Sequence, residues 1–201
     1  CDTCIEPEGY RLEVETVMEH TGGELDSMTT YRVHLVCQDT DDYVYSLSSS
    51  TLAPLYISTT SGVWYNHPSN DTWNASGITP ALLENESLVA FDSYLTIGSV
   101  NSEGPTPAGI WFPGNDPRPE FEPDGGSNFA LDPGPGTIYQ FYPGMGQSTT
   151  HPAFAGDDYR VLLMQITTNG DVEGQFGVRV YPNGQQEQST SLNLQFDSSS
   201  A

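Results

Sequence analysis

The sequence predicts an all-β fold: an antiparallel β-sandwich of two sheets, jelly-roll or immunoglobulin-like, with long ordered loops rich in proline and glycine. Apolar and polar residues alternate with a period of two at many places, whereas helical periodicity is almost absent. The length of 201 residues is typical of one large β domain. We therefore expect a single sandwich over 10–197, flanked by a cysteine-bearing connector at 1–9 and a serine-rich connector at 198–201.

The first two expected strands each have one apolar and one polar face. In 10–18 the apolar side chains from Leu12 to Met18 alternate with charged ones, and 30–37 repeats the pattern and ends at Cys37. Such alternation is typical of strands with one side in water.

Seven further segments have strand-like composition. The segment 161–164 is apolar on both faces, which indicates a central strand. Asn-Gly pairs in 167–174 and 181–188 predict tight hairpins, so the last three strands are expected to form an antiparallel meander. One helix is expected at 79–86, where Thr79 can cap and a proline follows it. The expected strands are 54–59, 62–66, 88–100, 137–142, 159–168, 174–182 and 189–197.

The segments between these strands divide into two kinds. The serine-rich runs at 46–51 and 197–201 indicate solvated loop and linker. The segment 101–136 is dense in proline and glycine, but its aromatic residues predict an ordered excursion over the sandwich rather than a linker. Those aromatic residues are Trp111, Phe112, Phe121 and Phe129.

The charge balance excludes some partners. The chain has 27 acidic residues, only five arginines, no lysine and a formal net charge of −22. Nucleic-acid binding needs clustered Lys or Arg, so a nucleic-acid partner is not expected, and neither is an anionic membrane surface. The longest apolar runs are too short to span a membrane. Such acidity suits high salt, where self-repulsion is screened.

The three cysteines suggest a covalent fastening. Cys1 and Cys4 have the C-x-x-C spacing of redox and zinc sites, but the acidic residues around them would raise a thiol pKa, and a second pair of zinc ligands is missing. We expect a disulfide from Cys37 to Cys4 or to Cys1. The cysteine left over would then bond to another domain or chain.

Motifs for catalysis are weak in this sequence. The G-x-S-x-G elbow is absent, and the four histidines lack metal-ligand spacing, so we expect surface or capping roles for them. A paired-carboxylate glycoside hydrolase is the third functional hypothesis, because two acids can meet from distant strands.

Calcium is the ion that the loop carboxylates suit best, because Ca²⁺ selects hard oxygen ligands. The acidic loop segments lack EF-hand spacing, and the alternative to a calcium site is that they are solvated acidic turns. The main candidates are Asp39, Asp41, Asp42, Asp157 and Asp158, and a further run holds Asp116, Glu120, Glu122 and Asp124.

The sequence contains candidate glycosylation sites and candidate sugar-binding residues. Asn70, Asn74 and Asn85 lie in N-x-S/T sequons, and Ser27 lies in a D-S-M stretch similar to bacterial O-glycosylation acceptors. As binding groups, loop aromatics could stack on sugar rings, and the alternative is that they cover the core. These aromatics are Trp64, Tyr65, Trp73, Trp111 and Phe112.

Three stretches in order carry a family resemblance: TTYRVHL (29–35, preceded by VETVMEHTGGELDSM), DSYLTIG (92–98) and DDYRVLLMQITTNGDVEGQ (157–175). Over about 10–196 the chain resembles a recurrent domain of very large secreted or cell-surface proteins of marine Bacteroidota. The resemblance implies building blocks, often repeated and flanked by short cysteine-bearing segments, on polypeptides exported with a C-terminal sorting domain. It implies no catalytic residues.

Two functions are thus expected from different classes. The leading one is a non-enzymatic extracellular structural module of a surface fibre, filament or adhesin, whose partners are copies of itself or neighbouring domains. The alternative is a calcium-assisted polysaccharide-binding module. Unpaired strand edges would carry the contacts in the first case.

Overall fold

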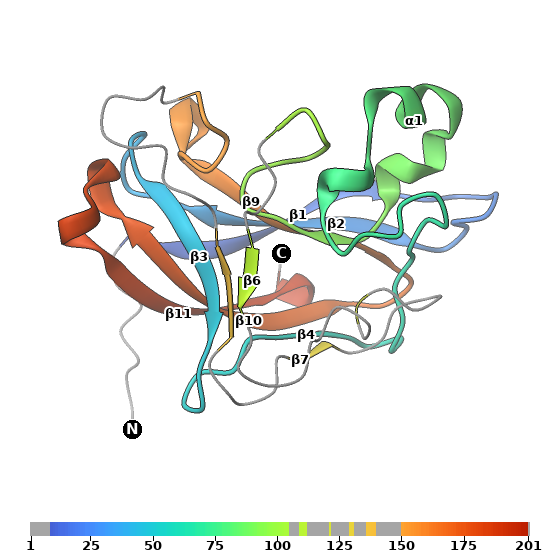
Figure 1. Cartoon of the computed structure of the whole chain (residues 1–201). Helices are drawn as coiled ribbons and strands as arrows, with labels where there is room; N and C mark the ends of the chain where they lie inside the picture. The colour runs from blue at the N-terminus through green and yellow to red at the C-terminus, as the bar shows by residue number, and fades with distance from the viewer. Residues whose placement is uncertain are drawn as a thin grey trace.

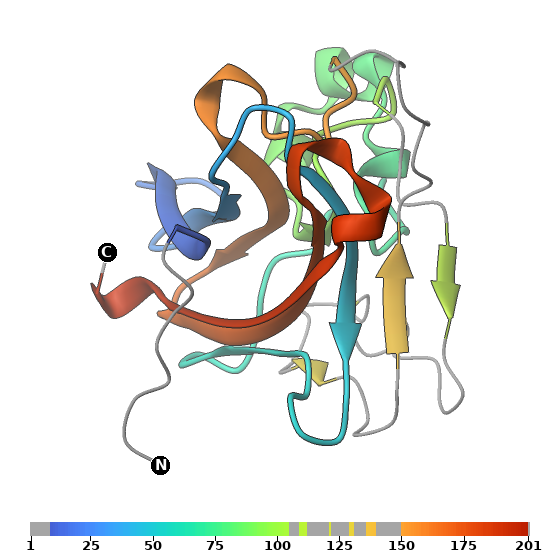
Figure 2. The ribbon, with the colours of Figure 1, turned by 90° about the vertical axis from the view of Figure 1, so that its left-hand side faces the viewer.

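A computed structural model describes residues 9–104, 109–111, 121, 129–130, 136–139 and 150–200. They form two antiparallel sheets with few helices, which confirms the predicted all-β sandwich (Figures 1 and 2). The expected excursion at 101–136 and the N-terminal connector lie largely outside the described residues.

The smaller sheet has the strand order β1-β2-β9-β5. As predicted, β9 lies inside the sheet, and every residue after its first is buried. The strands are β1 (Arg11–Glu19), β2 (Thr29–Val36), β9 (Arg160–Thr168) and β5 (Tyr94–Leu95).

The larger sheet is organised around β10. One edge of β10 pairs with β11 along its length, and the other edge pairs with β4 in the first half and with β3 in the second. The hairpin predicted between the last two strands is therefore confirmed. The strands are β3 (Tyr43–Ser49), β4 (Tyr56–Thr59), β6 (Gly109–Trp111), β7 (Phe129–Ala130), β8 (Gly136–Tyr139), β10 (Val172–Tyr181) and β11 (Thr190–Asp197).

The helical elements are short. The predicted helix is present as α1, and the Thr79 hydroxyl accepts a hydrogen bond from the Leu82 amide at 3.1 Å, as an N-cap should. The last serines, expected as a connector, form a turn in which the Ser198 hydroxyl accepts from the Val172 amide at 2.8 Å. The elements are α1 (Pro80–Asn85) and the 3₁₀ turns η1 (Ala75–Gly77), η2 (Ser87–Phe91), η3 (Gly156–Asp158), η4 (Pro182–Gly184), η5 (Gln186–Gln188) and η6 (Ser198–Ser200).

The main core lies between the two sheets and includes the fully buried Trp64, Tyr43 and Phe176. A smaller apolar cluster lies on the outer face of the β1-β2-β9-β5 sheet, where η1, α1 and η2 cover Leu162 and Tyr94. The outer face of this sheet is thus partly covered at one end and open at the other.

The hairpin predicted at 167–174 is wrong. β9 and β10 belong to different sheets, so the turn at Asn169 and Gly170 carries the chain across the sandwich. Each strand already has partners on both edges: β2 and β5 flank β9, and β11 flanks β10 opposite β3 and β4. The Thr60 hydroxyl holds the turn by accepting from the Asp171 amide at 2.9 Å.

Other strand assignments also need correction. The serine run expected as solvated loop is part of β3, where Ser46 and Ser49 are buried; the Ser49 hydroxyl accepts from the Leu55 amide at 3.0 Å. A local hydrogen bond of this kind offsets the cost of burying a hydroxyl. The segment 62–66 is not a strand, and 88–100 forms η2 and only the two residues of β5.

Met18 does not share the inner face with Leu12 and Val14. The register between β1 and β2 shifts between Thr16 and Met18, so Met18 pairs with Thr30 and is 45 % exposed. A bulge inserts one residue, and one extra residue reverses the alternation of faces.

Candidate functional site

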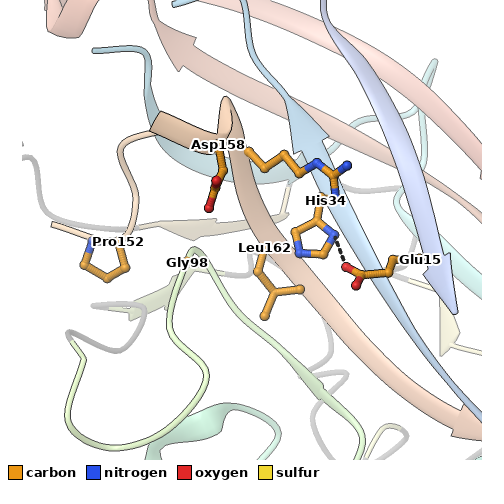
Figure 3. A pocket seen from close by; sticks show the side chains of 7 residues that line it. Glu15, His34, Gly98, Pro152, Asp158 and Leu162 are labelled. Carbon is orange, nitrogen blue, oxygen red and sulfur yellow. Dashed lines mark ion pairs between the residues drawn. The ribbon is translucent and has the colours of Figure 1, made fainter. Parts of the chain in front are cut away.

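A polar pocket of about 550 Å³ opens where the outer face of the smaller sheet meets two loops (Figure 3). Alternation along β1, β2 and β9 places side chains of all three strands on this face, and the antiparallel registers bring them together. The lining residues are Glu15, His34, Gly98, Pro152, Asp158, Arg160 and Leu162.

Two ion pairs and one hydrogen bond hold three arginines on this face. Arg160 Nη2 lies 2.7 Å from Glu13 Oε1, and Arg11 Nη2 lies 3.3 Å from the second oxygen of the same carboxylate. Arg32 donates through Nε to the Gln165 side-chain oxygen at 2.9 Å. Three of the five arginines of a strongly acidic chain therefore lie on one sheet face.

His34 is the most buried titratable group of the pocket, with 13 % of its side chain exposed. Its Nδ1 lies 3.6 Å from Glu15 Oε2, which is too long for a hydrogen bond, and Nδ1 has no hydrogen-bond partner. Burial lowers the His34 pKa, Glu15 opposes this, and Arg160 adds to the lowering. The imidazole is therefore neutral near pH 7 and exposes a ring edge toward Leu162 (Figure 3).

The pocket wall depends on a close approach of two loops. Gly98 has φ +86°, and a Cβ atom there would lie 1.9 Å from the Pro152 carbonyl oxygen. The Gly98 amide also donates to the Leu162 carbonyl at 2.8 Å. Only glycine fits this position, so the wall is defined by backbone rather than by mobile side chains.

Tyr159 stands between two lining residues, Asp158 and Arg160, in a left-handed conformation with φ 56°. Its side chain is 45 % exposed, and its carbonyl accepts from the Cys37 amide at 2.8 Å. A bulky residue in this region carries backbone strain of about 1–3 kcal/mol, and such residues cluster at functional sites.

A second titratable cluster lies beside η2. Asp92 is 1 % exposed; it accepts from the His67 amide and from the Asn70 side-chain amide, both at 2.6 Å. Burial raises the pKa of Asp92 to about 7, although these hydrogen bonds oppose the rise. The carboxylate fastens the 67–74 loop to the body of the domain.

The structure does not gather the expected calcium ligands into one cluster. Asp42 is buried, and its carboxylate accepts from Tyr10 Oη and the amides of Gln38, Asp39 and Asn183 at 2.9–3.1 Å. Asp41 and Asp157 are exposed, and Asp158 lines the pocket described above. Among the described residues no three acidic, histidine or cysteine side chains form a metal-binding group. The run from Asp116 to Asp124 lies outside these residues.

The sugar-stacking role expected of Trp64 is wrong, because its ring is 1 % exposed and its Nε1 donates to the Phe121 carbonyl at 3.2 Å. Trp73 packs against the core, so the alternative of core cover fits both residues. The Trp111 backbone belongs to β6, whereas its side chain and Phe112 lie outside the described part of the chain.

The four glycosylation candidates differ in exposure. Asn70 is 2 % exposed and Asn74 is 8 % exposed, and Asn74 Oδ1 accepts from the Ser76 amide at 2.9 Å. Asn85 and Ser27 are exposed, Ser27 with φ 65°. The folded domain therefore presents Asn85 and Ser27 to solvent, whereas Asn70 and Asn74 serve the fold.

Cys37 is a free, buried thiol whose pKa is raised by burial. In this structure Cys37 carries no disulfide, and its side chain packs into the core between the sheets. Cys1 and Cys4 themselves lie outside the described residues.

The pocket was not expected from the sequence. Strand alternation correctly places Glu15 and His34 on a polar face, but nothing local indicates that Gly98 and Pro152 close one side. His67 and His151 fit the expected capping roles, since each accepts a backbone N–H two residues ahead, at 3.2 and 3.1 Å.

None of the helices in the described residues is both long and apolar enough to span a membrane. In comparisons with known proteins, no family model, no curated protein and no solved structure matched this chain.

Proposed function

We propose that this chain is a non-enzymatic structural module of the cell exterior, which joins copies of itself or neighbouring domains through a strand edge into a surface fibre. The edge is that of β11. The observation that supports this proposal is the difference between the two long edge strands, β1 and β11, of the sandwich.

β1 carries the features that keep an edge strand from pairing with another chain. Its nine residues include Arg11, Glu13, Glu15 and Glu19, and its register with β2 is broken by the bulge after Thr16. Charged side chains and bulges are the usual protection of natural edges.

β11 has little of this protection. Its eight residues TSLNLQFD pair with β10 in an unbroken register and contain no lysine, arginine or proline. The exposed face shows the neutral Ser191, Asn193 and Gln195 and a single charged residue, Asp197, at its end, while the leucines and phenylalanine between them are buried. Among the described residues no strand pairs with the outer edge of β11, which lies on the side of the domain that faces the viewer in Figure 2.

An extended segment of another chain can add to such an edge by main-chain hydrogen bonds. Pairing of β11 with the β11 of a copy would stop at a dimer, whereas pairing with a different edge continues as a filament. The net charge of −22 opposes either contact at low salt and does so less in seawater-like salt, where the Debye length is only a few ångströms.

The test is the mass of the protein in solution, measured by multi-angle light scattering over a range of protein and salt concentrations. We expect multimers whose mass increases with protein concentration and with salt concentration. The double substitution Asn193→Lys with Gln195→Lys should leave monomers. Lysine on the exposed face of an edge strand resists pairing.

The matched control is Gln186→Lys with Gln188→Lys, which adds the same charge at exposed positions of η5, outside the strands. It should assemble like the unmodified chain. Monomers at every concentration, or equal loss in both double variants, would contradict the assembly proposal, and a product that stops at a dimer would contradict the filament.

A further inference from the structure

We propose that the pocket on the outer face of the smaller sheet binds a neutral saccharide, independently of assembly at β11. The chemistry of the lining, the charge of the pocket and its shape each support this inference. None of the lining residues belongs to β11.

The lining offers hydrogen-bond acceptors and donors side by side. The carboxylates of Glu15 and Asp158 lie at different sides of the pocket, and neutral His34 lies between Glu15 and Leu162 (Figure 3). Arg160 uses Nη2 for Glu13 and has further N–H groups to donate. A sugar hydroxyl both donates and accepts, so adjacent hydroxyls match a lining of this kind.

Charge selects against anionic ligands. The net charge of −22 disfavours an anion at long range. At short range two carboxylates, Glu15 and Asp158, line the pocket, and the charge of Arg160 is already paired with Glu13. Burial keeps His34 from adding a positive charge at neutral pH. A neutral polar molecule avoids this repulsion.

The shape also suits a sugar ring. A volume of about 550 Å³ lies within the usual range of small-molecule pockets. Leu162 and Pro152 add apolar surface for the C–H face of a ring, and the Gly98–Pro152 contact holds that wall in place.

The experiment is a screen on an array of neutral oligosaccharides, followed by NMR titration of the ¹⁵N-labelled chain with the best binder. We expect shifts confined to the amides of the pocket, Gly98 and Arg160 among them. Asp158→Asn and Glu15→Gln should each weaken binding about tenfold, because each removes a charged hydrogen-bond acceptor.

Two matched controls separate the pocket from general acidity. Asp157→Asn changes the exposed neighbour of Asp158, and Glu19→Gln changes an exposed carboxylate of the same strand as Glu15; neither residue lines the pocket. Both should bind like the unmodified chain, and the amide spectra of all four variants report that they are folded.

Salt provides a further test. The affinity for a neutral sugar should stay the same between low and high NaCl, since screening acts on charged ligands. Absence of any binder on the array, equal behaviour of Asp158→Asn and Asp157→Asn, or an affinity that falls steeply with salt would each overturn the proposal.

Discussion

Asp92 should make the stability of this domain fall as the pH rises from about 4 to 7. Its carboxyl is buried, and its pKa is raised from 3.8 to about 7 in the folded state. A group whose pKa is raised on folding contributes stability that is fully present below the unfolded pKa and is lost as the pH passes the folded pKa. A difference of about three pKa units corresponds to ~4 kcal/mol at most.

The perturbation that isolates this effect is Asp92→Asn, which keeps one oxygen to accept from His67 or Asn70 and cannot ionise. Urea unfolding of both proteins between pH 4 and pH 8 gives the difference in their free energies of unfolding. As the pH rises, we expect the free energy of unfolding of the variant to increase relative to that of the unmodified chain by up to ~4 kcal/mol.

Comparing the two proteins at each pH cancels the contribution of the other acidic residues. Asp71→Asn, at an exposed carboxylate of the same loop, is the matched control. A difference between Asp92→Asn and the unmodified chain that stays constant within ~0.5 kcal/mol across this range would refute the reasoning.

Two further outcomes are expected. Gly98→Ala should lower the free energy of unfolding by ~2 kcal/mol or more, because its Cβ would meet the Pro152 carbonyl. The control is Gly62→Ala, at a position with φ +75° and open space around it, which should lower the free energy of unfolding by only ~1 kcal/mol. Equal losses for the two variants in urea unfolding would contradict the close contact. Cys37 should resist iodoacetamide in the native chain and react after denaturation, because its thiol is buried with a raised pKa. The check is a peptide map by mass spectrometry, recorded without and then with reduction. Finding Cys37 in a disulfide would contradict the free thiol.

Several features of the fold were predictable because they depend on neighbours in the sequence. The alternation in 10–18 and 30–37 predicted β1 and β2, and Thr79 predicted the start of α1. The serines of β3 misled the prediction, since a hydroxyl satisfied by a backbone amide can be buried, and composition does not report that partner.

The candidate site was predictable only in part. Alternation placed Glu15 and His34 on a polar face, but the registers of β1, β2 and β9 bring them to Arg160. The sequence left open whether Trp64 stacks on sugar or covers the core, and the core contact with Phe121, which is 57 residues away, decides for the core.

The sequence by itself determined the all-β class, the strongly acidic charge and the polar face of the first strands, because composition and two-residue alternation are local properties of the chain. The tertiary structure alone decided that β10 leaves β9 to pair with β11, that no other strand of the described residues pairs with β11, and that the Gly98 and Pro152 loops meet at one wall of the pocket. Strand partners and loop contacts form between residues far apart in the sequence, and their choice rests on packing and burial summed over the whole domain.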